Sequence, residues 1–468
     1  MKITKYKIFF FLIGVFLYSK NVYSQSENAL SFMDNLYQST YYSPFNTSEF
    51  KVSIGLPGLS SVYLNARNSG FSALQAFQNK DVTKKIDPSL VLDKMKSSEY
   101  VGLNTQVDLF HLFVQKGEHG FSFNITENVN ARFSYPSDLL RLAWRGNGPF
   151  VGDQINLSKF AIDYNHYREY VLGYYRTKDK WQFGGKAKFL FGKSAIQTKK
   201  STLTIDVEND YDHLVKGDFL INTAGFSDFG IDFSKPLDSL QGDNDEDKAF
   251  QNYILNNKNK GFALDFGTSF KYSEKLQFNA AVSNLGFIRW KEKPANITYN
   301  EEVAVVGVDV FEVLFKNNLD SLEKGFENYF DEQFPDTITT KASQKSFTTY
   351  LPVNIALGAR YDIWKKTYAV GRVNFTGYKG IQTAVTVGVY HDFFRWFNIG
   401  LTNTYMYGRV WNPGLGLVLK GGPVQFYLAT DNLYAAHFMR TKQASIRFGI
   451  NLVFGKIKDQ EKISSVIK

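Results

Sequence analysis

Histidine, serine and acidic side chains are the groups of this chain that could catalyse a reaction. The sequence has six histidines and no cysteine. A nucleophile-activating site needs a histidine that bonds a serine or cysteine and a carboxylate. No histidine has such partners at a diagnostic spacing, although catalytic groups can assemble from distant segments. We therefore expect a protein that is not an enzyme. The histidines are His111, His119, His166, His213, His391 and His437.

One acidic run resembles part of a cation-binding loop. Residues 243–247 include four carboxylates, which are ligands that Ca²⁺ prefers. An EF-hand loop starting there would need a glycine at Lys248 and a glutamate at Ile254, so that motif is absent. The sequence also has no paired metal-ligand spacing and no glycine-rich phosphate loop. We expect a solvated loop at this run, no metal and no cofactor.

The stretch 445–455 shows how the rest of the chain is organised. Successive side chains of a strand point to opposite faces, and here one face is apolar while the other carries a charge and an amide. A strand of about ten residues with this pattern, ending on an aromatic residue, suits a tilted bilayer-spanning strand. The apolar face consists of Ile446, Phe448, Ile450, Leu452 and Phe454, and the other face of Arg447, Gly449, Asn451 and Val453.

Four polar residues fall on the faces that would point into a lumen. They are Asp265 and Lys271 in one alternating stretch, and Arg447 and Asn451 in the last one. In an open pore such groups set solute selectivity. In a closed barrel they form an internal network, and we favour this alternative because buried charges must be paired.

Composition agrees with an exported barrel. Aromatic residues make up 16% of the chain, and no later segment reaches the ~18 apolar residues of a membrane helix. Residues 1–24 combine a basic start with a short apolar run and small residues, which predicts a signal peptide. The formal net charge is +9, and removing the four lysines of that peptide leaves +5. This excess is too mild to indicate nucleic acid and suits contact with anionic lipid and lipopolysaccharide.

Connection lengths give the predicted barrel a direction. Short turns at 115–118, 177–179, 273–274, 364–366 and 421–422 would all lie at one end, and long connections at 68–98, 132–156, 223–260 and 291–345 at the other. Outer-membrane barrels have short periplasmic turns and long outer loops. We predict an all-β, transmembrane antiparallel β-barrel over 50–455, a periplasmic or plug segment at 25–49 and a polar tail at 456–468. The barrel has fourteen strands, or sixteen if 194–222 is a membrane hairpin.

Three short helices are expected in the long loops. Asp87-Pro88 and Pro136 are typical helix starts. Residues 311–330 have apolar side chains at helical spacing, which indicates an amphipathic helix that either covers the barrel rim or docks a partner. The residues of this docking or lid stripe are Phe311, Phe315, Leu319, Leu322 and Phe326.

The chain also resembles a known group of proteins. The stretches 261–290, 412–433 and 446–455, and the opening ENALSFMDNLYQSTYYSPFN at 27–46, resemble an uncharacterised family of Bacteroidota outer-membrane barrels. That family is similar in architecture to the fatty-acid-channel and type IX secretion shuttle barrels. The resemblance favours fourteen strands and implies the outer membrane of a Gram-negative bacterium, without defining any catalytic or ligand residue.

Two functions follow from these observations. The resemblance to secretion-associated barrels favours a non-enzymatic accessory component that binds other outer-membrane or periplasmic proteins. The alternative is a passive channel for hydrophobic or small solutes, gated by the loop helices or by the N-terminal segment.

Overall fold

The computed structural model describes residues 28–76, 87, 89–208, 213–226, 246–305, 341–406, 410–434 and 441–457. The predicted signal peptide, the predicted helix at 311–330 and nearly all of the polar tail lie outside these residues. Within them, no helix is long and apolar enough to cross a membrane.

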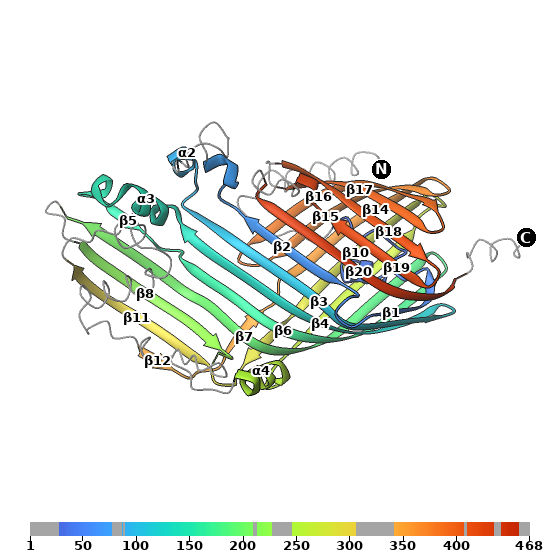
Figure 1. Cartoon of the computed structure of the whole chain (residues 1–468), viewed down its shortest axis with the longest axis horizontal. Coiled ribbons are helices and arrows are strands. Elements are labelled where there is room, and N and C mark those ends of the chain that lie inside the picture. The colour runs from blue at the N-terminus through green and yellow to red at the C-terminus, as the bar shows by residue number, and fades with distance from the viewer. Residues whose placement is uncertain are drawn as a thin grey trace, which may run out of the picture.

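The chain forms a closed antiparallel β-barrel of fourteen strands, which confirms the predicted fold class (Figure 1). Consecutive strands pair with each other, as expected when short turns join alternating stretches. β13 (Phe347–Tyr350) lies beside β10 just before β14. The barrel strands are β1 (Phe50–Gly55) continued by β2 (Val62–Asn68), β3 (Ser98–Lys116), β4 (His119–Pro136), β6 (Ala161–Lys178), β7 (Trp181–Val207), β9 (Asn259–Lys271), β10 (Leu276–Trp290), β14 (Val353–Trp364), β15 (Thr367–Gly377), β16 (Ile381–Phe394), β17 (Phe397–Met406), β18 (Val410–Gly421), β19 (Val424–Thr430) and β20 (Gln443–Lys456).

The first and last strands close the barrel. β1 and β2 both pair with β20 on one side and with β3 on the other, so together they occupy one strand position. Between them the chain leaves the regular ladder at 56–61, where Gly58 N–H donates to the Asp108 carbonyl (3.0 Å) and Ile450 N–H to the Leu59 carbonyl (2.9 Å). The wall is therefore continuous in hydrogen bonds, although its first strand is bulged.

The two faces of the wall follow the predicted alternation. In β20, Ile446, Phe448 and Phe454 are exposed on the outer face, whereas Arg447 and Asn451 are fully buried on the lumen face. Outward aromatic and aliphatic side chains suit lipid, and inward polar side chains suit a filled lumen.

The stretch 194–222 is not a membrane hairpin, so the sixteen-strand alternative is wrong. The second half of β7 continues past the barrel and pairs with β8, and β8 pairs with β11 (Figure 1). Many side chains of the stretch 194–222 are charged or carry a hydroxyl group, which explains why apolar and polar residues alternate poorly there. The strands of this outer sheet besides β7 are β5 (Gln154–Asn156), β8 (His213–Ala224), β11 (Ala295–Val305) and β12 (Lys341–Ser343).

The two ends of the barrel differ as predicted. One end has only short turns, and we call it the short-turn end. The other has the long connections, and we call it the long-loop end. Two of the predicted loop helices are present: α2 (Ser89–Leu92) and α3 (Ser137–Arg145). A third helix, α4 (Glu246–Leu255), includes the end of the acidic run and was not predicted.

Candidate functional site

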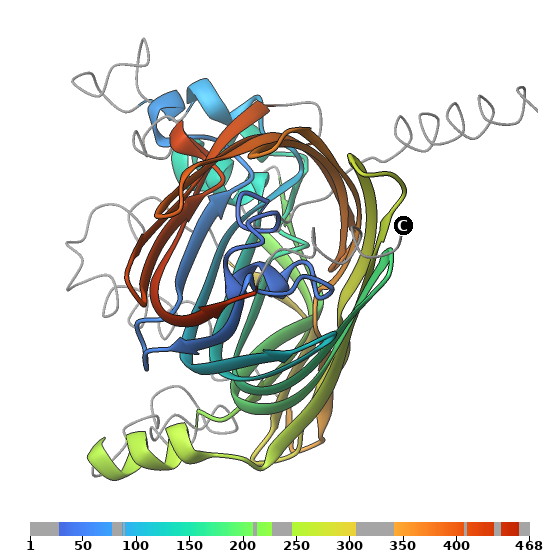
Figure 2. The same cartoon turned by 90° about the vertical axis from the view of Figure 1, so that its right-hand side faces the viewer.

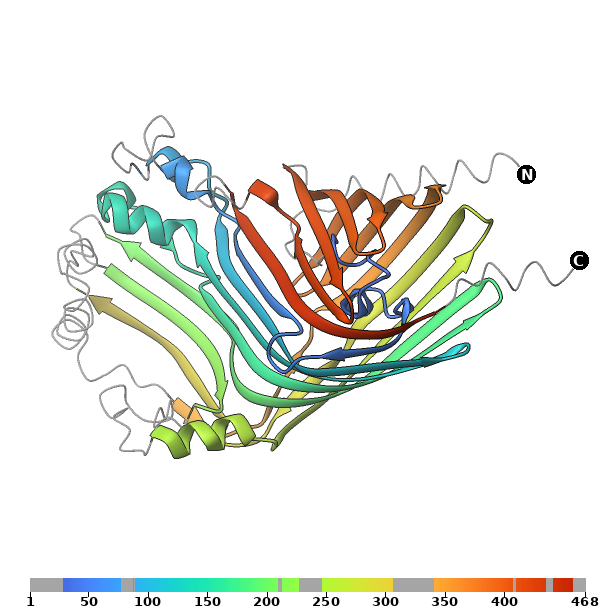
Figure 3. The same cartoon turned by 45° about the vertical axis from the view of Figure 1, so that its right-hand side comes forward.

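Residues 28–49 lie inside the barrel, in the half nearer the short-turn end. We call them the lumen segment, and Figures 2 and 3 show it as a dark-blue chain within the ring of strands. It folds as successive turns around one 3₁₀ turn, Tyr37–Tyr41. The Ser31 carbonyl accepts hydrogen bonds from Ser43 Oγ (3.0 Å) and Asn46 Nδ2 (3.3 Å), so the segment is held compact by its own side chains.

One side of the lumen segment is apolar and packs on the C-terminal strands. Leu30, Phe32, Met33 and Leu36 are buried there. Because these side chains leave water only when they contact the wall, they favour the closed arrangement by the hydrophobic effect. The wall residues that they meet are Tyr368, Val370, Tyr390, Val418, Tyr427 and Ala429.

Wall tyrosines hold the backbone of the segment. Tyr390 Oη donates to the Ala29 carbonyl (2.8 Å), and Tyr368 Oη donates to the Phe32 carbonyl (2.8 Å). The Ala29 carbonyl gains a hydrogen-bond partner from the wall, and the Phe32 carbonyl, which also accepts the Asp34 N–H (3.2 Å), gains a second one. The two phenol hydroxyls take the place of water as hydrogen-bond donors to this buried, irregular backbone.

Charged wall residues add directional contacts. Arg372 donates to Ser43 Oγ (2.8 Å) and to the Tyr42 carbonyl (2.6 Å). Lys186 Nζ donates to Thr40 Oγ1 (3.0 Å) from the opposite wall. Asp431 Oδ1 accepts the backbone N–H groups of residues 28 and 29 (3.0 and 2.9 Å). The segment is thus gripped from both sides of the lumen.

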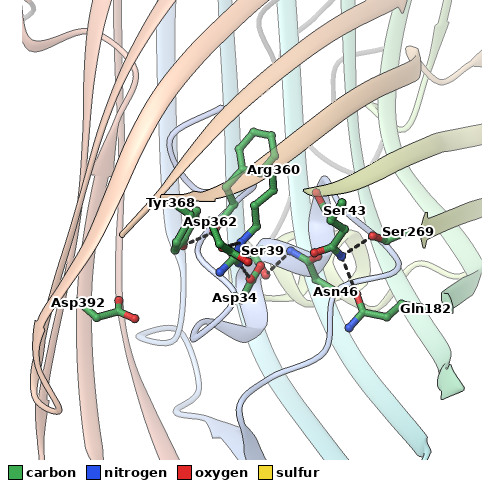
Figure 4. A network of polar contacts seen from close by, with 12 residues as sticks. Asp34, Ser39, Ser43, Asn46, Gln182, Ser269, Arg360, Asp362, Tyr368 and Asp392 are labelled. Carbon is green, nitrogen blue, oxygen red and sulfur yellow. Dashed lines mark hydrogen bonds and ion pairs between the residues drawn. The ribbon is translucent and has the colours of Figure 1, made fainter. Parts of the chain in front are cut away.

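At the short-turn end, the segment is held by an ion pair at its edge (Figure 4). Arg360 pairs with Asp34 and with Asp362 (2.8 Å), and its guanidinium lies 3.6 Å from the centre of the Tyr368 ring. The side chains of Arg360 and Asp34 are 24% and 48% exposed. A cavity of about 260 Å³ lies beside them, between the segment and the wall, and it is lined by both polar and apolar groups. Solvent therefore reaches this edge of the segment.

Two wall glycines make room for the segment. A Cβ at Gly184 would lie 1.7 Å from the Pro44 carbonyl oxygen, and one at Gly416 would lie 2.6 Å from Met33 Sδ. Any larger side chain at Gly184 would collide with backbone, which cannot rotate away. The lumen wall is therefore shaped for this segment.

Arg447 and Asn451 both contact the lumen segment. Arg447 is fully buried, donates to Gln106 Oε1 (2.6 Å) and to Ser61 Oγ, and lies 5.5 Å from the centre of the Tyr41 ring. Asn451 exchanges two hydrogen bonds with Gln38 of the segment, at 2.9 and 3.0 Å. The structure brings these two predicted lumen residues together around the segment.

Asp265 and Lys271 have different positions. Asp265 is fully buried, pairs with Lys188 (2.9 Å) and accepts the backbone N–H of Asn284 (2.7 Å). Lys271 lies exposed at the short-turn end of β9. Its backbone N–H donates to the Lys180 carbonyl (2.8 Å). Three of the four candidates thus belong to paired internal contacts, whereas the fourth does not.

The structure also brings histidines close to hydroxyl and acidic groups. His111 Nε2 lies 3.1 Å from Ser53 Oγ, both fully buried in the wall. His166 lies between Glu127 (2.7 Å) and the hydroxyl of Tyr253 (2.5 Å). Neither histidine links a serine to a carboxylate, as nucleophile activation would require. No group of three or more metal-ligating side chains occurs among the described residues.

A second hollow lies on the outer face of the wall. Its volume is about 630 Å³, and apolar side chains such as Phe121, Leu172 and Phe266 line it between β3 and β9. Gly185 contributes no side chain at this place. Since these lining side chains are exposed on the outer, apolar face of the wall, this hollow is separate from the lumen.

Comparison with known proteins identifies the family. Residues 44–431 match a family described as "Family of unknown function (DUF5723)". The chain belongs to this family. The expected membership of an uncharacterised barrel family is confirmed, whereas a Bacteroidota source remains a prediction. No curated protein shows a significant match.

Solved structures with a similar arrangement include hydrocarbon-transport barrels. The toluene transporter TodX of Pseudomonas putida has 6% sequence identity and a TM-score of 0.41, with 93% of this chain and 98% of that chain covered. The toluene transporter TbuX of Ralstonia pickettii has 9% identity, a TM-score of 0.40, and 88% and 92% coverage. A FadL homologue of Pseudomonas aeruginosa has 8% identity, a TM-score of 0.38, and 91% and 96% coverage. At such identities and TM-scores the likeness carries no conclusion about the function of this chain.

Proposed function

We propose that this protein is a non-enzymatic outer-membrane channel for small solutes with an apolar body, and that the lumen segment is its gate. The observation that carries the proposal is the placement of residues 28–49 inside a fourteen-strand barrel, gripped by side chains of the lumen wall. In the proposed orientation, the short-turn end faces the periplasm and the long-loop end faces outward.

The contacts of the lumen segment support a gate that can open. Many of them are single hydrogen bonds, each with a net contribution of about 0.5–1.5 kcal/mol. The donors and acceptors are groups that water can satisfy once the segment has moved. The ion pair between Arg360 and Asp34 is already partly solvated. Opening therefore exchanges protein contacts for hydration, and the main opposing term is the apolar cluster around Leu30 and Leu36.

The wall behind the segment supports the solute class. When the segment leaves, it uncovers the rings and hydroxyl groups of Tyr368 and Tyr390 beside Val370 and Val418. Aromatic and aliphatic faces bind apolar bodies, and phenol hydroxyls donate hydrogen bonds. Small apolar molecules that carry one acceptor, such as an ester or a ketone, fit this surface.

The partner-binding role favoured by the sequence depended on the stripe at 311–330. Because that stretch lies outside the described residues, the structure adds nothing to that role. The lumen segment supports the alternative directly, and we therefore propose the channel in place of the accessory component.

A reversible cross-link tests the gate. Gln38 and Asn451 form a reciprocal hydrogen-bonded pair, and the chain has no native cysteine. The double variant Gln38→Cys, Asn451→Cys can therefore be bridged specifically by a short bis-methanethiosulfonate reagent. In proteoliposomes we expect the bridge to stop the flux of a small aromatic ester, and reduction to restore it. The two single-cysteine variants, treated alike, are the controls.

Deletion of residues 28–46 provides the opposite test. We expect faster flux through a barrel that still shows heat-modifiable gel mobility. A folded deletion variant without any flux would overturn the channel proposal. Equal flux in the bridged and unbridged protein would overturn the role of the segment as the gate.

A further inference from the structure

We propose that α4 is an interfacial helix that lies in the lipid head-group layer at the long-loop end, with Phe250 inserted among the acyl chains. The proposed occupant of its exposed apolar flank is membrane lipid. This inference is independent of whether the lumen conducts solutes.

α4 is docked on the lipid-facing side of the wall. Glu127 on β4 and His166 on β6 lie beneath it. Each is an even number of residues from an exposed side chain of the same strand, Phe121 on β4 and Leu172 on β6, and therefore points to the same face. The hydroxyl of Tyr253 in α4 lies 2.5 Å from His166 Nδ1. The helix therefore covers the outside of the barrel and not its lumen.

Hydrogen bonds fix the helix at this place. The Tyr253 hydroxyl also lies 2.7 Å from Ser194 Oγ on β7. Lys193 Nζ donates to the carbonyls of Ile254 (2.7 Å) and Asn256 (2.6 Å), which belong to the last turn of the helix and the residues after it. A cation at this end complements the helix dipole. Burial raises the pKa of the Tyr253 hydroxyl, so this group remains protonated and available as a donor.

The polar cluster under α4 marks the level of the membrane surface. Glu127 bonds both Arg168 (2.6 Å) and His166 (2.7 Å) on the outer face of the wall. A cation on the lipid face costs about 2–4 kcal/mol at mid-bilayer and about 0–1 kcal/mol near the interface. Such a cluster is therefore compatible with the interface and not with the middle of the hydrocarbon layer. α4, which is bonded to the cluster, must lie at the same level.

The helix points along the membrane and not away from it. Viewed along the long axis of the molecule, α4 projects sideways beyond the outline of the barrel (Figure 2). In the perpendicular view it is seen nearly end-on, beside the wall (Figure 1). A helix that leaves a barrel sideways at the interface runs through the head-group layer.

The side chains of α4 divide into three faces at 3.6 residues per turn. Ala249 and Tyr253 are buried against the wall. One flank carries Phe250, which is 58% exposed, and the opposite flank carries Lys248 and Asn252, which are also exposed. An exposed phenylalanine on one side and polar groups on the other is the pattern of a helix lying in an interface.

Continuity with the wall identifies lipid as the occupant. Phe250 is exposed on a helix that is docked on the lipid-facing side of the wall. A water-exposed loop helix gains nothing by presenting this side chain, whereas an interfacial helix buries it in acyl chains.

Site-directed spin labelling tests the proposal on the full-length protein. A nitroxide is attached to Phe250→Cys or to Asn252→Cys in a chain that has no native cysteine, and the protein is reconstituted in vesicles that contain lipopolysaccharide. Accessibility to oxygen reports lipid, and accessibility to a water-soluble nickel complex reports water. Labels at Leu172→Cys on the lipid face and Lys200→Cys on the outer sheet provide the two reference values.

We expect the label at 250 to resemble the lipid reference and the label at 252 to resemble the water reference. If both labels on α4 resemble the water reference, the proposal is wrong. Dipolar broadening between labels at 250 would instead show contact between two copies of the chain, and would equally overturn lipid as the occupant.

Discussion

The two faces of the barrel wall each hold one docked segment, and they hold it differently. Inside, the lumen segment is buried on nearly all sides and bonded to strands around the lumen. Outside, α4 is attached through Tyr253 and through Lys193, and it leaves Phe250 exposed. The inner segment therefore depends on the protein for its environment, whereas the outer helix depends on the membrane.

The comparison also shows how the same chemistry serves both faces. A tyrosine hydroxyl anchors each segment: Tyr390 from the wall onto the lumen segment, and Tyr253 from α4 onto the wall. Tyrosine suits both roles, because its ring packs in apolar surroundings while its hydroxyl satisfies one polar partner. What differs is the medium next to the anchor, which is protein on the inside and lipid on the outside.

A charge on the outer face should have the largest effect. Phe448 lies on the lipid face of β20, where Phe448→Arg should cost about 2–4 kcal/mol near mid-bilayer. We expect poor insertion into vesicles, measured as loss of the folded band in heat-modifiable gel mobility. Phe448→Leu is the control. Normal insertion of the arginine variant would mean that this face does not contact hydrocarbon.

The same substitution on the inner face of this strand should act on the segment and not on insertion. Asn451→Arg places a larger side chain where Gln38 and Gln425 now bond the amide, and overpacking costs about 1–3 kcal/mol. We expect a folded barrel whose residues 28–49 become accessible to protease. Failure to insert, as in the outer-face variant, would show that the two faces of β20 have been exchanged.

Loss of one hydroxyl should release α4 and leave the barrel intact. Tyr253→Phe removes the group between His166 and Ser194, at a cost of about 0.5–1.5 kcal/mol. We expect faster hydrogen exchange of the α4 amides with unchanged exchange in β6. Tyr272→Phe, at an exposed tyrosine, is the matched control and should change neither.

The smallest effect should come from the edge of the lumen segment. Arg360→Ala removes the ion pair with Asp34, and partly exposed pairs contribute about 0–1 kcal/mol. We expect a modest rise in solute flux, which high salt should largely reproduce in the unmodified protein. Arg145→Ala breaks an ion pair with Asp93 in the outer loops and should leave the flux unchanged. A large rise in solute flux would show that this ion pair is the main contact that holds the lumen segment in place.

The regular wall could be predicted from the sequence because period-two alternation is a local signal. The inward and outward residues of β20 follow directly from it, as do the short turns and the start of α3 at Pro136. The residue at which β7 leaves the barrel was harder to predict, because the strand keeps pairing with β8 beyond that point. Strand pairing alone does not tell where a bilayer ends.

A plug segment at 25–49 was expected from the sequence, but the contacts of the two docked segments could not be predicted, because their partners are remote in sequence. Glu127, His166, Ser194 and Tyr253 come from three strands and a helix, and no local pattern links them. One signal was available for the lumen segment. Gly184 lies at an inward position where a side chain is expected, and its absence marks where another part of the chain approaches.

The seam between β1 and β20 bears on the order of assembly. Phe50 pairs with Lys456, at opposite ends of the barrel sequence, and contacts between distant residues form slowly because they must overcome the entropy of closing a long loop. Until that seam forms, the nascent wall is a curved open sheet. The lumen segment precedes β1 directly and contacts β15 and β16 as well as β7. Its contacts with opposite parts of the wall therefore form only when those strands have come to lie around the same lumen.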